Sequence, residues 1–490
     1  MSSIFICFFI KMYNIDVCSI LYYNLVLFML NLEEINNIVS KDYNSKLQKI
    51  TSFIDDSLIN NVYIKDKSVF VDTSVIRYII VRYLTIDEVY RIKDLDIIID
   101  SLDKDSFFSA IERIYDNWDT SIKTKNILLL YSIFGNNYSL INLYNSAKNI
   151  SSNRYKLSSF YLEAISLSNT NLGYYFIYEA LKTFKQNSIR EKAQEILDSK
   201  IKEIDTTEEE FVDSIIPNFN FNSNGVRYYN EDNKKYRILF KDNISFSFYD
   251  ETKEKELKTI PSVFPDVLKK EISNLKSVIK NIIKIEKNRL IIDFISGRKW
   301  KYRNWREIFC DNPIIKRFAI SLIWCIYDRD DNYIDSFRYM DDGSFNNAFD
   351  EEIFISDDSY ISLFISYNAD NDIINSWREQ LSDYEIIQPF NQLSNMSFEE
   401  LKEKISNSTS TLSSLNKMFN DLGFTKYSID NVFYGYYLYD SYSCSNISIF
   451  SEGMYYGASY TDTINIHISI STNSDRFLYC IYFLMSNYLN

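Results

Sequence analysis

Apolar residues recur at helical spacing through the N-terminal part of the chain. Three runs show the pattern: residues 127–134, which stop at Gly135, then 157–165, then 174–184. All five prolines lie after residue 216, and Gly135 and Gly173 are the only glycines before it. Uninterrupted amphipathic segments of this kind predict successive antiparallel helices. We therefore expect residues 1–205 to form an α-helical region like a HEAT solenoid, built from stacked helix pairs.

The period of the pattern changes shortly after residue 205. Thr207 and Glu210 have the spacing of a capping box, which predicts a short helix ending before Pro217. Residues 236–240 and 244–248 then alternate between apolar and polar side chains across a polar link. Alternation of this kind predicts a β-hairpin, and so places a domain boundary near residues 205–225.

Helices and strands are mixed in the rest of the chain. Apolar residues trace one stripe of a helix over 266–295, and Lys269, Lys276, Lys280 and Lys287 trace a second stripe beside it. The remaining segments are predicted as strands at 323–327, 334–340 and 352–355, helices at 370–383 and 397–406, and antiparallel strands over the last sixty residues, including 433–439, 446–450 and 463–470. The fold class is therefore α+β. We divide the chain into the helical region 1–205, a mixed α/β core domain at 206–395 with antiparallel strands, and a C-terminal α+β portion of the same domain at 396–490.

Composition narrows the classes of partner. The chain has 490 residues, a net charge of -14 and a pI of about 4.9, so it should repel phosphate backbones and anionic membrane surfaces as a whole. The six cysteines are scattered and form no C-x-x-C pair. Scattered cysteines in apolar runs are typical of buried free thiols, and we expect a cytoplasmic protein.

Two apolar segments, residues 4–10 and 17–30, lie near the N-terminus. Both are shorter than the roughly 18 to 20 residues that span a bilayer, and no basic segment precedes them. A packed first helix, or an over-extended start, is favoured over a secreted or membrane protein.

Common catalytic and nucleotide-binding patterns are missing from the sequence. The single histidine, His467, allows no multi-histidine metal site, and neither G-x-G-x-x-G nor G-x-x-x-x-G-K occurs. Asp328, Asp330 and Asn332 match the start of a calcium loop, but Tyr333 and Tyr339 stand where glycine and glutamate are required. An acidic hairpin turn is the better interpretation. We expect no cofactor and no metal site.

A basic, aromatic segment is the strongest local anomaly. Residues 252–306 contain 15 Lys or Arg against 6 Asp or Glu, and Arg298, Lys299, Trp300, Trp305 and Arg306 interleave cations with aromatic rings near its end. Such a segment can bind phosphates and stack on bases. The alternative, which we favour, is that the lysines are solvated and the tryptophans anchor the segment in the core.

Several motifs in order resemble the MolR-like family, a bacterial domain of unknown function named after a molybdate metabolism regulator. The matching segments are Ile216-Pro217, 258–261, 296–300, 305–309, Asn312-Pro313, 322–324, Phe337-Arg338, 342–345, Trp377 and 383–392, and the likeness covers about residues 120–490. Members often carry helical repeats and a Trp-Gly-Arg (WGR) module, but this chain has no Trp-Gly-Arg triplet. The family commonly shows His-Pro where this chain has Asn312-Pro313 and Ser366-Tyr367.

Three hypotheses for function follow. The first is a non-enzymatic regulatory or protein-interaction scaffold whose partner is another protein. The second is binding of a nucleotide, an ADP-ribose-like ligand, another anion or nucleic acid through the basic aromatic segment, with Gln388 and Gln392 as further ligand-binding candidates. The third, ranked last, is a carboxylate-based, metal-dependent enzyme. An open pocket formed by Trp300, Trp305, Gln388 and Gln392 would favour ligand binding, and a dry core would favour packing.

Overall fold

The chain folds into two compact units, Met1–Pro217 and Asn218–Asn490, which we call the N-terminal unit and the C-terminal unit. The computed structural model describes residues 30–488, apart from 232–233, 368, 423–424, 430–432, 441–444, 453–462 and 472–473, and gives the backbone alone for strands β11 to β14. Both apolar segments near the N-terminus and His467's side chain lie outside the described residues, apart from Leu30. No described helix is long and apolar enough to cross a membrane.

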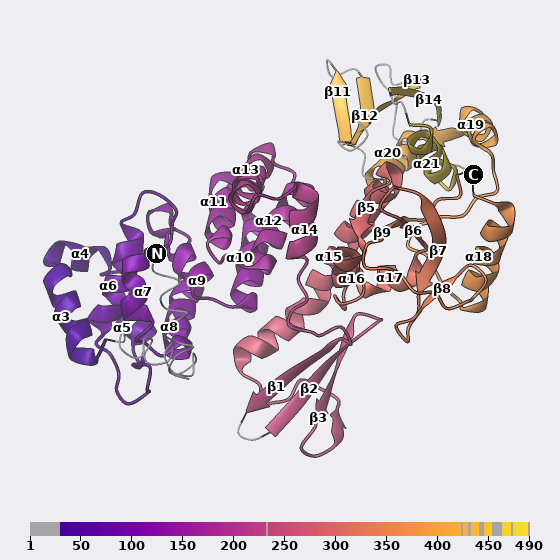
Figure 1. The fold of residues 1–490 in the computed structure, drawn as a ribbon. Coiled ribbons are helices and arrows are strands. Elements are labelled where there is room, and N and C mark those ends of the chain that lie inside the picture. Colours follow the sequence, from indigo (N-terminus) through magenta and orange to yellow (C-terminus); the bar gives the residue numbers. More distant parts are fainter. Residues whose placement is uncertain are drawn as a thin grey trace, which may run out of the picture. The chain divides into compact units, whose positions relative to one another are not determined.

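The described part of the N-terminal unit is helical. Its elements are α3 (Leu32–Asp42), α4 (Ser45–Ile50), α5 (Asp56–Ile59), α6 (Thr73–Leu84), η1 (Lys93–Leu95), α7 (Asp96–Ile99), α8 (Lys104–Asp116), η2 (Ile122–Thr124), α9 (Ile127–Ile133), α10 (Asn137–Ile150), α11 (Tyr155–Ser166), α12 (Asn171–Thr183), α13 (Asn187–Ile204) and α14 (Glu208–Ile215) (Figure 1). From α9 onward, alternate helices pack together, α9 on α11 on α13 and α10 on α12 on α14. Two layers of alternate helices are the arrangement of a short solenoid. Helices in the N-terminal part are thus confirmed for the described residues, and the bounds 1–205 stay a prediction.

Polar side chains cap the N-termini of several of these helices. Asp72 accepts a hydrogen bond from the Ser74 N–H at the start of α6, and Thr170 accepts one from the Gly173 N–H at the start of α12. Thr207 caps α14 by accepting from the Glu210 N–H, but Thr206, not Thr207, donates to the Glu210 carboxylate. These contacts satisfy backbone N–H groups that have no partner inside the helix.

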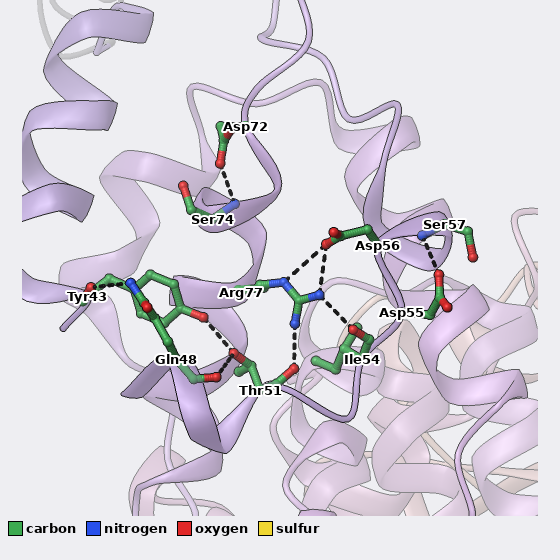
Figure 2. A network of polar contacts seen from close by, with 10 residues as sticks. All are labelled: Tyr43, Gln48, Thr51, Ile54, Asp55, Asp56, Ser57, Asp72, Ser74 and Arg77. Carbon is green, nitrogen blue, oxygen red and sulfur yellow. Dashed lines mark hydrogen bonds and ion pairs between the residues drawn. The ribbon is translucent and has the colours of Figure 1, made fainter. Parts of the chain in front are cut away.

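Arg77 of α6 holds the link between α4 and α5 (Figure 2). Its guanidinium donates to the carbonyl of Thr51, to the carbonyl of Ile54 at 2.6 Å and to the Asp56 carboxylate at 2.8 Å. Figure 2 shows the three acceptors gathered around the one side chain. Because the planar group has its donors in fixed directions, it locks this turn in place, and the network is structural.

The C-terminal unit begins with a four-stranded antiparallel sheet in the order β1 (Val226–Glu231), β2 (Lys234–Lys241), β3 (Ser245–Asp250), β4 (Lys255–Leu257). The predicted hairpin is confirmed as β2 and β3, with Ile238 opposite Phe248. Arg227 of β1 forms an ion pair of 2.8 Å with Glu271 of the next helix, α15 (Asp266–Ser296). The ion pair fixes α15 to the edge strand of this sheet.

Helix α15 ends at Gly297, which has a positive φ of 75° and donates its N–H to the Asp293 carbonyl. A side chain at this position would strain the backbone and would meet the Arg476 guanidinium at 2.8 Å. The chain then enters strand β5 directly. The glycine of the Ser296–Trp300 motif is therefore explained by the way the helix ends.

A second antiparallel sheet has the order β5 (Lys299–Lys301), β9 (Tyr360–Leu363), β6 (Trp324–Tyr327), β7 (Tyr333–Tyr339), β8 (Phe345–Asn347). Neighbouring residues in a strand point to opposite faces. Trp324 packs on Trp305 of α16 (Tyr302–Phe309), whereas Cys325 lies in the cluster with Trp377 of α18 (Asn371–Asp383). The sheet is thus covered by α16 on one face and α18 on the other, with the short α17 (Lys316–Ser321) against β7.

A third antiparallel sheet has the order β10 (Thr409–Thr411), β14 (Thr463–Ser471), β13 (Ser445–Glu452), β12 (Phe433–Asp440), β11 (Thr425–Ile429). It is accompanied by α19 (Phe398–Ser406), α20 (Leu412–Asp421) and α21 (Asp475–Ser486). The predicted α+β class is confirmed. The finer division of the chain at residue 395 stays a prediction.

Two predicted strands are wrong. Residues 475–486, expected among the C-terminal strands, form helix α21, which Ser474 caps through the Phe477 N–H. Buried residues lie on all faces of this helix, so its sequence shows no alternation of apolar and polar faces. Residues 352–355 form a loop with a single bridge from Glu352 to Asn346, and Phe354 is 91% exposed.

Candidate functional site

The tryptophans of the basic aromatic segment lie in the core of the second sheet. Trp305 is fully buried, and its ring centre is 5.1 Å from that of Trp324 and 5.5 Å from that of Phe337. Trp300 is 4% exposed and lies 6.0 Å from Trp324. Their aromatic faces contact other rings of the protein, so base stacking on them would require the core to open.

The cations of the segment differ in their surroundings. Arg298 is buried, lies 4.8 Å above the Trp300 ring and is 3.6 Å from the Asp293 carboxylate. Lys299 pairs with Asp331 and lies 3.5 Å from the centre of the Tyr327 ring. Arg306 is exposed on α16. Of the three, Arg306 alone is exposed, and its side chain contacts the Tyr302 hydroxyl.

The two predicted glutamines form an internal anchor. Gln392 is fully buried; its side-chain oxygen accepts from the Ile323 N–H at 2.8 Å, and its amide donates to the carbonyls of Ile323 at 2.9 Å and Phe364 at 3.1 Å. Gln388 is half-buried and donates to the same Gln392 oxygen at 2.8 Å. The side chain of Gln392 therefore ties the segment after α18 to the start of β6 and the end of β9.

The structure does not bring the seven predicted residues to one open pocket. Trp300 and Trp305 both contact Phe309 in the aromatic cluster around α16. Gln392 lies close to this cluster, because it bonds the backbone of Ile323, which precedes Trp324. The proposed role of all seven in binding a ligand stays a prediction, and ring stacking is the part of it that burial makes most costly.

An open groove lies along the segment that Gln392 anchors. One hollow of about 400 Å³ is lined by Arg378, Asn391, Leu393, Ser394, Asn395, Met396, Glu400, Lys404, Phe483, Ser486 and Asn487. A second of about 170 Å³ is lined by Lys287, Ile291, Pro389, Phe390, Asn391, Leu422, Leu484, Asn487 and Tyr488. Because Asn391 and Asn487 belong to both walls, the hollows adjoin, and we call them together the 389–396 groove.

The walls of this groove carry cations that the described residues do not neutralise. Arg378 donates to the neutral side-chain oxygens of Asn395 at 2.8 Å and Asn375 at 3.4 Å. Lys404 donates to the Ser486 carbonyl at 2.9 Å, at the end of α21. Lys287 is half-buried in the smaller hollow and forms no ion pair with a described residue. The groove therefore has a positive wall.

Glu400 is the single carboxylate among the described lining residues. It accepts from the Ser397 N–H at 2.6 Å, in the capping box predicted for α19, and this hydrogen bond lowers the pKa of its carboxyl. Its charge is thus partly used by the helix start. Amide side chains from Asn391, Asn395 and Asn487 complete the walls and can both donate and accept hydrogen bonds.

Other predicted features are structural in the described part of the chain. The acidic turn between β6 and β7 is confirmed: Asp328 accepts from the N–H groups of Asp330 and Asn332, and the Asn332 bonds lower its pKa. Cys310 and Cys325 are free and buried, and burial raises the pKa of each thiol to about 12. No group of three or more described His, Cys, Asp or Glu residues is placed to hold a metal ion.

Sequence reasoning missed most of the groove. Arg378, Asn395, Lys404 and Asn487 come from four segments with no common spacing, and only folding brings them together. The segment 383–392, which matches a family motif, lies partly in the groove wall. The motif gave no indication of which other residues line the groove. Lys287 was visible only as one member of a lysine stripe.

Comparison with known proteins places this region in an uncharacterised class. Residues 255–415, which include β5 to β9 and part of the groove, match the family described as "Domain of unknown function (DUF4132)". The chain is also 23% identical over 242 residues to the protein named "Uncharacterized protein YehI" of Escherichia coli (strain K12). That match covers 48% of this chain but 20% of the relative, so the chain spans only a small part of that protein. No solved structure matches the chain. The narrower likeness to the MolR-like family and to WGR-associated proteins stays a prediction.

Proposed function

We propose that this chain is a non-enzymatic scaffold that binds another protein, with the C-terminal unit as a rigid platform. The observation that carries the proposal is the open 389–396 groove, with an apolar floor at Leu393 and Phe483 and walls of amide and cationic side chains. Sites for small ligands are usually deep and mostly apolar. An open, amide-lined groove offers instead the hydrogen bonds that a peptide main chain needs.

The N-terminal unit supports the same proposal in a second way. Two layers of alternate helices, α9–α11–α13 and α10–α12–α14, form the kind of stacked array that proteins use as extended binding surfaces. In the scaffold hypothesis this unit supplies a further partner-binding surface. The printed name of the bacterial relative carries no information on activity, so the proposal rests on geometry.

The proposal can be tested by site-specific photo-cross-linking in the native host. A photoreactive amino acid replaces Asn395, which is exposed on the groove wall, and in a control replaces Asn243, which is exposed in the turn between β2 and β3. We expect a discrete protein adduct at position 395 only, and its loss when Arg378→Glu reverses the charge of the wall. Identical adducts at both positions, or no protein adduct at position 395, would contradict the scaffold proposal.

A further inference from the structure

We propose that the 389–396 groove binds an extended, acidic segment of a partner protein; this inference rests on the proposed function and names the chemistry of the partner. The carboxylates of that segment would meet Lys287, Arg378 and Lys404, and its main chain would bond the amides of Asn391, Asn395 and Asn487.

The charge pattern of the groove is the first argument. Lys287 and Arg378 have no carboxylate partner among the described residues, and Lys404 has only the Ser486 carbonyl. In a chain with a net charge of -14, the described lining of the groove holds these three cations against a single carboxylate, Glu400. Complementary charge across an interface speeds encounter and selects the partner.

Helix α15 extends the positive field beyond the groove. Lys276, Lys280 and Lys284 are exposed, and with Lys287 they follow the helical spacing that places residues on one face. Over the eleven steps from Lys276 to Lys287 an α-helix rises about 16 Å. None of the four pairs with a described acidic residue; three of them belong to the lysine stripe predicted from the sequence, whose remaining member, Lys269, pairs with Asp266. The row ends at Lys287 in the wall of the smaller hollow. A row of this kind steers an acidic chain to the groove.

The identity of the other lining groups favours a peptide over a polyphosphate strand. The lining of the groove combines its cations with amide side chains and with the apolar Leu393 and Phe483 of the larger hollow. A nucleic acid requires closely spaced cations along its phosphates. A peptide presents main-chain donors and acceptors together with apolar and charged side chains, and the lining offers amide, apolar and cationic groups that can meet each of them.

Fluorescence anisotropy with defined probes tests the inference on the full chain. The first probe is a labelled peptide composed of Glu, Ser and Leu, the second has every Glu changed to Gln, and the third is an oligo-dT strand of similar length. We expect the acidic peptide to bind at least about tenfold more tightly than the Gln peptide, and its affinity to fall as added salt shortens the screening length. Equal binding of the two peptides overturns the inference.

A matched pair of triple variants locates the binding. Lys287→Gln, Arg378→Gln and Lys404→Gln together should weaken acidic-peptide binding about tenfold, since each exposed ion pair contributes a fraction of a kcal/mol up to about one. Lys123→Gln, Lys255→Gln and Lys258→Gln remove the same charge from exposed positions outside the groove and should leave binding unchanged. Equal loss in both triples overturns the inference.

A gain in affinity provides a test that does not depend on the stability of the first triple variant. Glu400→Gln removes the one carboxylate of the described lining but keeps an oxygen to accept from the Ser397 N–H. Acidic-peptide binding should tighten about two- to threefold. An unchanged or weaker affinity counts against the inference.

The remaining outcomes separate the two proposals. If oligo-dT binds as tightly as the acidic peptide and shows the same dependence on the triple variants, the occupant is a polyphosphate strand and the inference is wrong. If Asn395 is cross-linked to a protein but no acidic peptide binds, the scaffold proposal stands and the acidic-segment inference falls.

Discussion

At the scale of single residues, the side-chain amide of Gln392 forms hydrogen bonds to the backbone as a peptide group of a neighbouring strand would. The amide accepts from the Ile323 N–H and donates to the carbonyls of Ile323 and Phe364, beside the direct backbone hydrogen bond from the Phe364 N–H to the Ile323 carbonyl. Buried backbone groups that lose their partner cost about 1–3 kcal/mol each. This side chain was a candidate ligand-binding residue in the sequence, and the structure shows it fully used inside the protein.

We predict that Gln392→Leu lowers the free energy of unfolding of the C-terminal unit by about 2–3 kcal/mol, because it leaves the buried Ile323 N–H without an acceptor. Urea unfolding measures the change. Gln388→Leu is the control: Gln388 is half-buried and bonds Gln392, so its loss should cost under about 1 kcal/mol. A Gln392→Leu variant as stable as the control would show that the anchor is unimportant.

Two neighbours in the basic aromatic segment should respond in opposite ways to truncation. Trp305 is buried against Trp324 and Phe337, so Trp305→Ala should destabilise the fold by about 3–5 kcal/mol. Arg306 is exposed, so Arg306→Ala should change stability by less than about 0.5 kcal/mol. Chemical denaturation measures the free energy of unfolding of both variants. A similar loss of stability in the two would refute the prediction that Trp305 belongs to the core and Arg306 does not.

At the scale of elements, helix starts make stability depend on pH. The hydroxyl and the backbone N–H of Ser74 both donate to the Asp72 carboxylate at the start of α6, and these hydrogen bonds lower the pKa of Asp72. The charged form is thus favoured in the folded state, and the stabilisation is complete above the unfolded pKa near 3.8 and is lost as pH falls through the lower folded pKa.

We predict that Asp72→Asn removes this pH dependence but keeps the cap, because the amide oxygen accepts the same bond and binds no proton. Melting temperatures are measured from acid to neutral pH. Near neutral pH the difference in melting temperature between wild type and variant should not change with pH. Below about pH 4 the wild type should lose stability relative to the variant. Asp87→Asn, at an exposed position outside the helices, is the control. Parallel curves for wild type and Asp72→Asn across the whole range would argue against the cap's titration.

Local patterns predicted fewer than half of the described helices and strands. Helices α9, α11, α12, α14, α15, α18 and α19 and strands β2, β3, β6, β7 and β12 to β14 were predicted from apolar spacing, alternation or capping residues. Helix α21 was missed since it is apolar all round, and β5, β8 and β9 since strands of three or four residues are too short to show a period.

The candidate site was harder to predict from the sequence than the fold, for a physical reason. A buried tryptophan and a ligand-stacking tryptophan look alike in a sequence, so Trp300 and Trp305 gave no means of choosing between core and pocket. The groove depends on contacts between α18, α19, α21 and the segment after α18, which are distant in the chain. Spacing rules apply within one element and do not reach such a surface.

At the scale of the whole molecule, the chain comprises two compact units with separate cores. Trp118 lies in the N-terminal unit, and Trp300, Trp305, Trp324 and Trp377 lie in the C-terminal unit. Tryptophan fluorescence therefore reports mainly on the second unit, whereas far-UV circular dichroism reports on helices in both.

We predict that the two signals do not coincide during urea unfolding of a Trp118→Phe variant. Fluorescence should follow one transition, and circular dichroism should show an additional change at a different urea concentration, because separate cores need not unfold together. Trp305→Ala should shift the fluorescence transition and leave the other in place. Superimposable curves for the two signals would mean that the chain unfolds as a single cooperative unit.

The anchor at Gln392 also affects the thermodynamics of whatever enters the groove. Because one buried side chain already fixes the 389–396 wall, that wall loses little conformational freedom when a partner arrives. The entropy lost on association would then come mainly from the incoming chain, and a stiff partner should bind more tightly than a flexible one of the same composition.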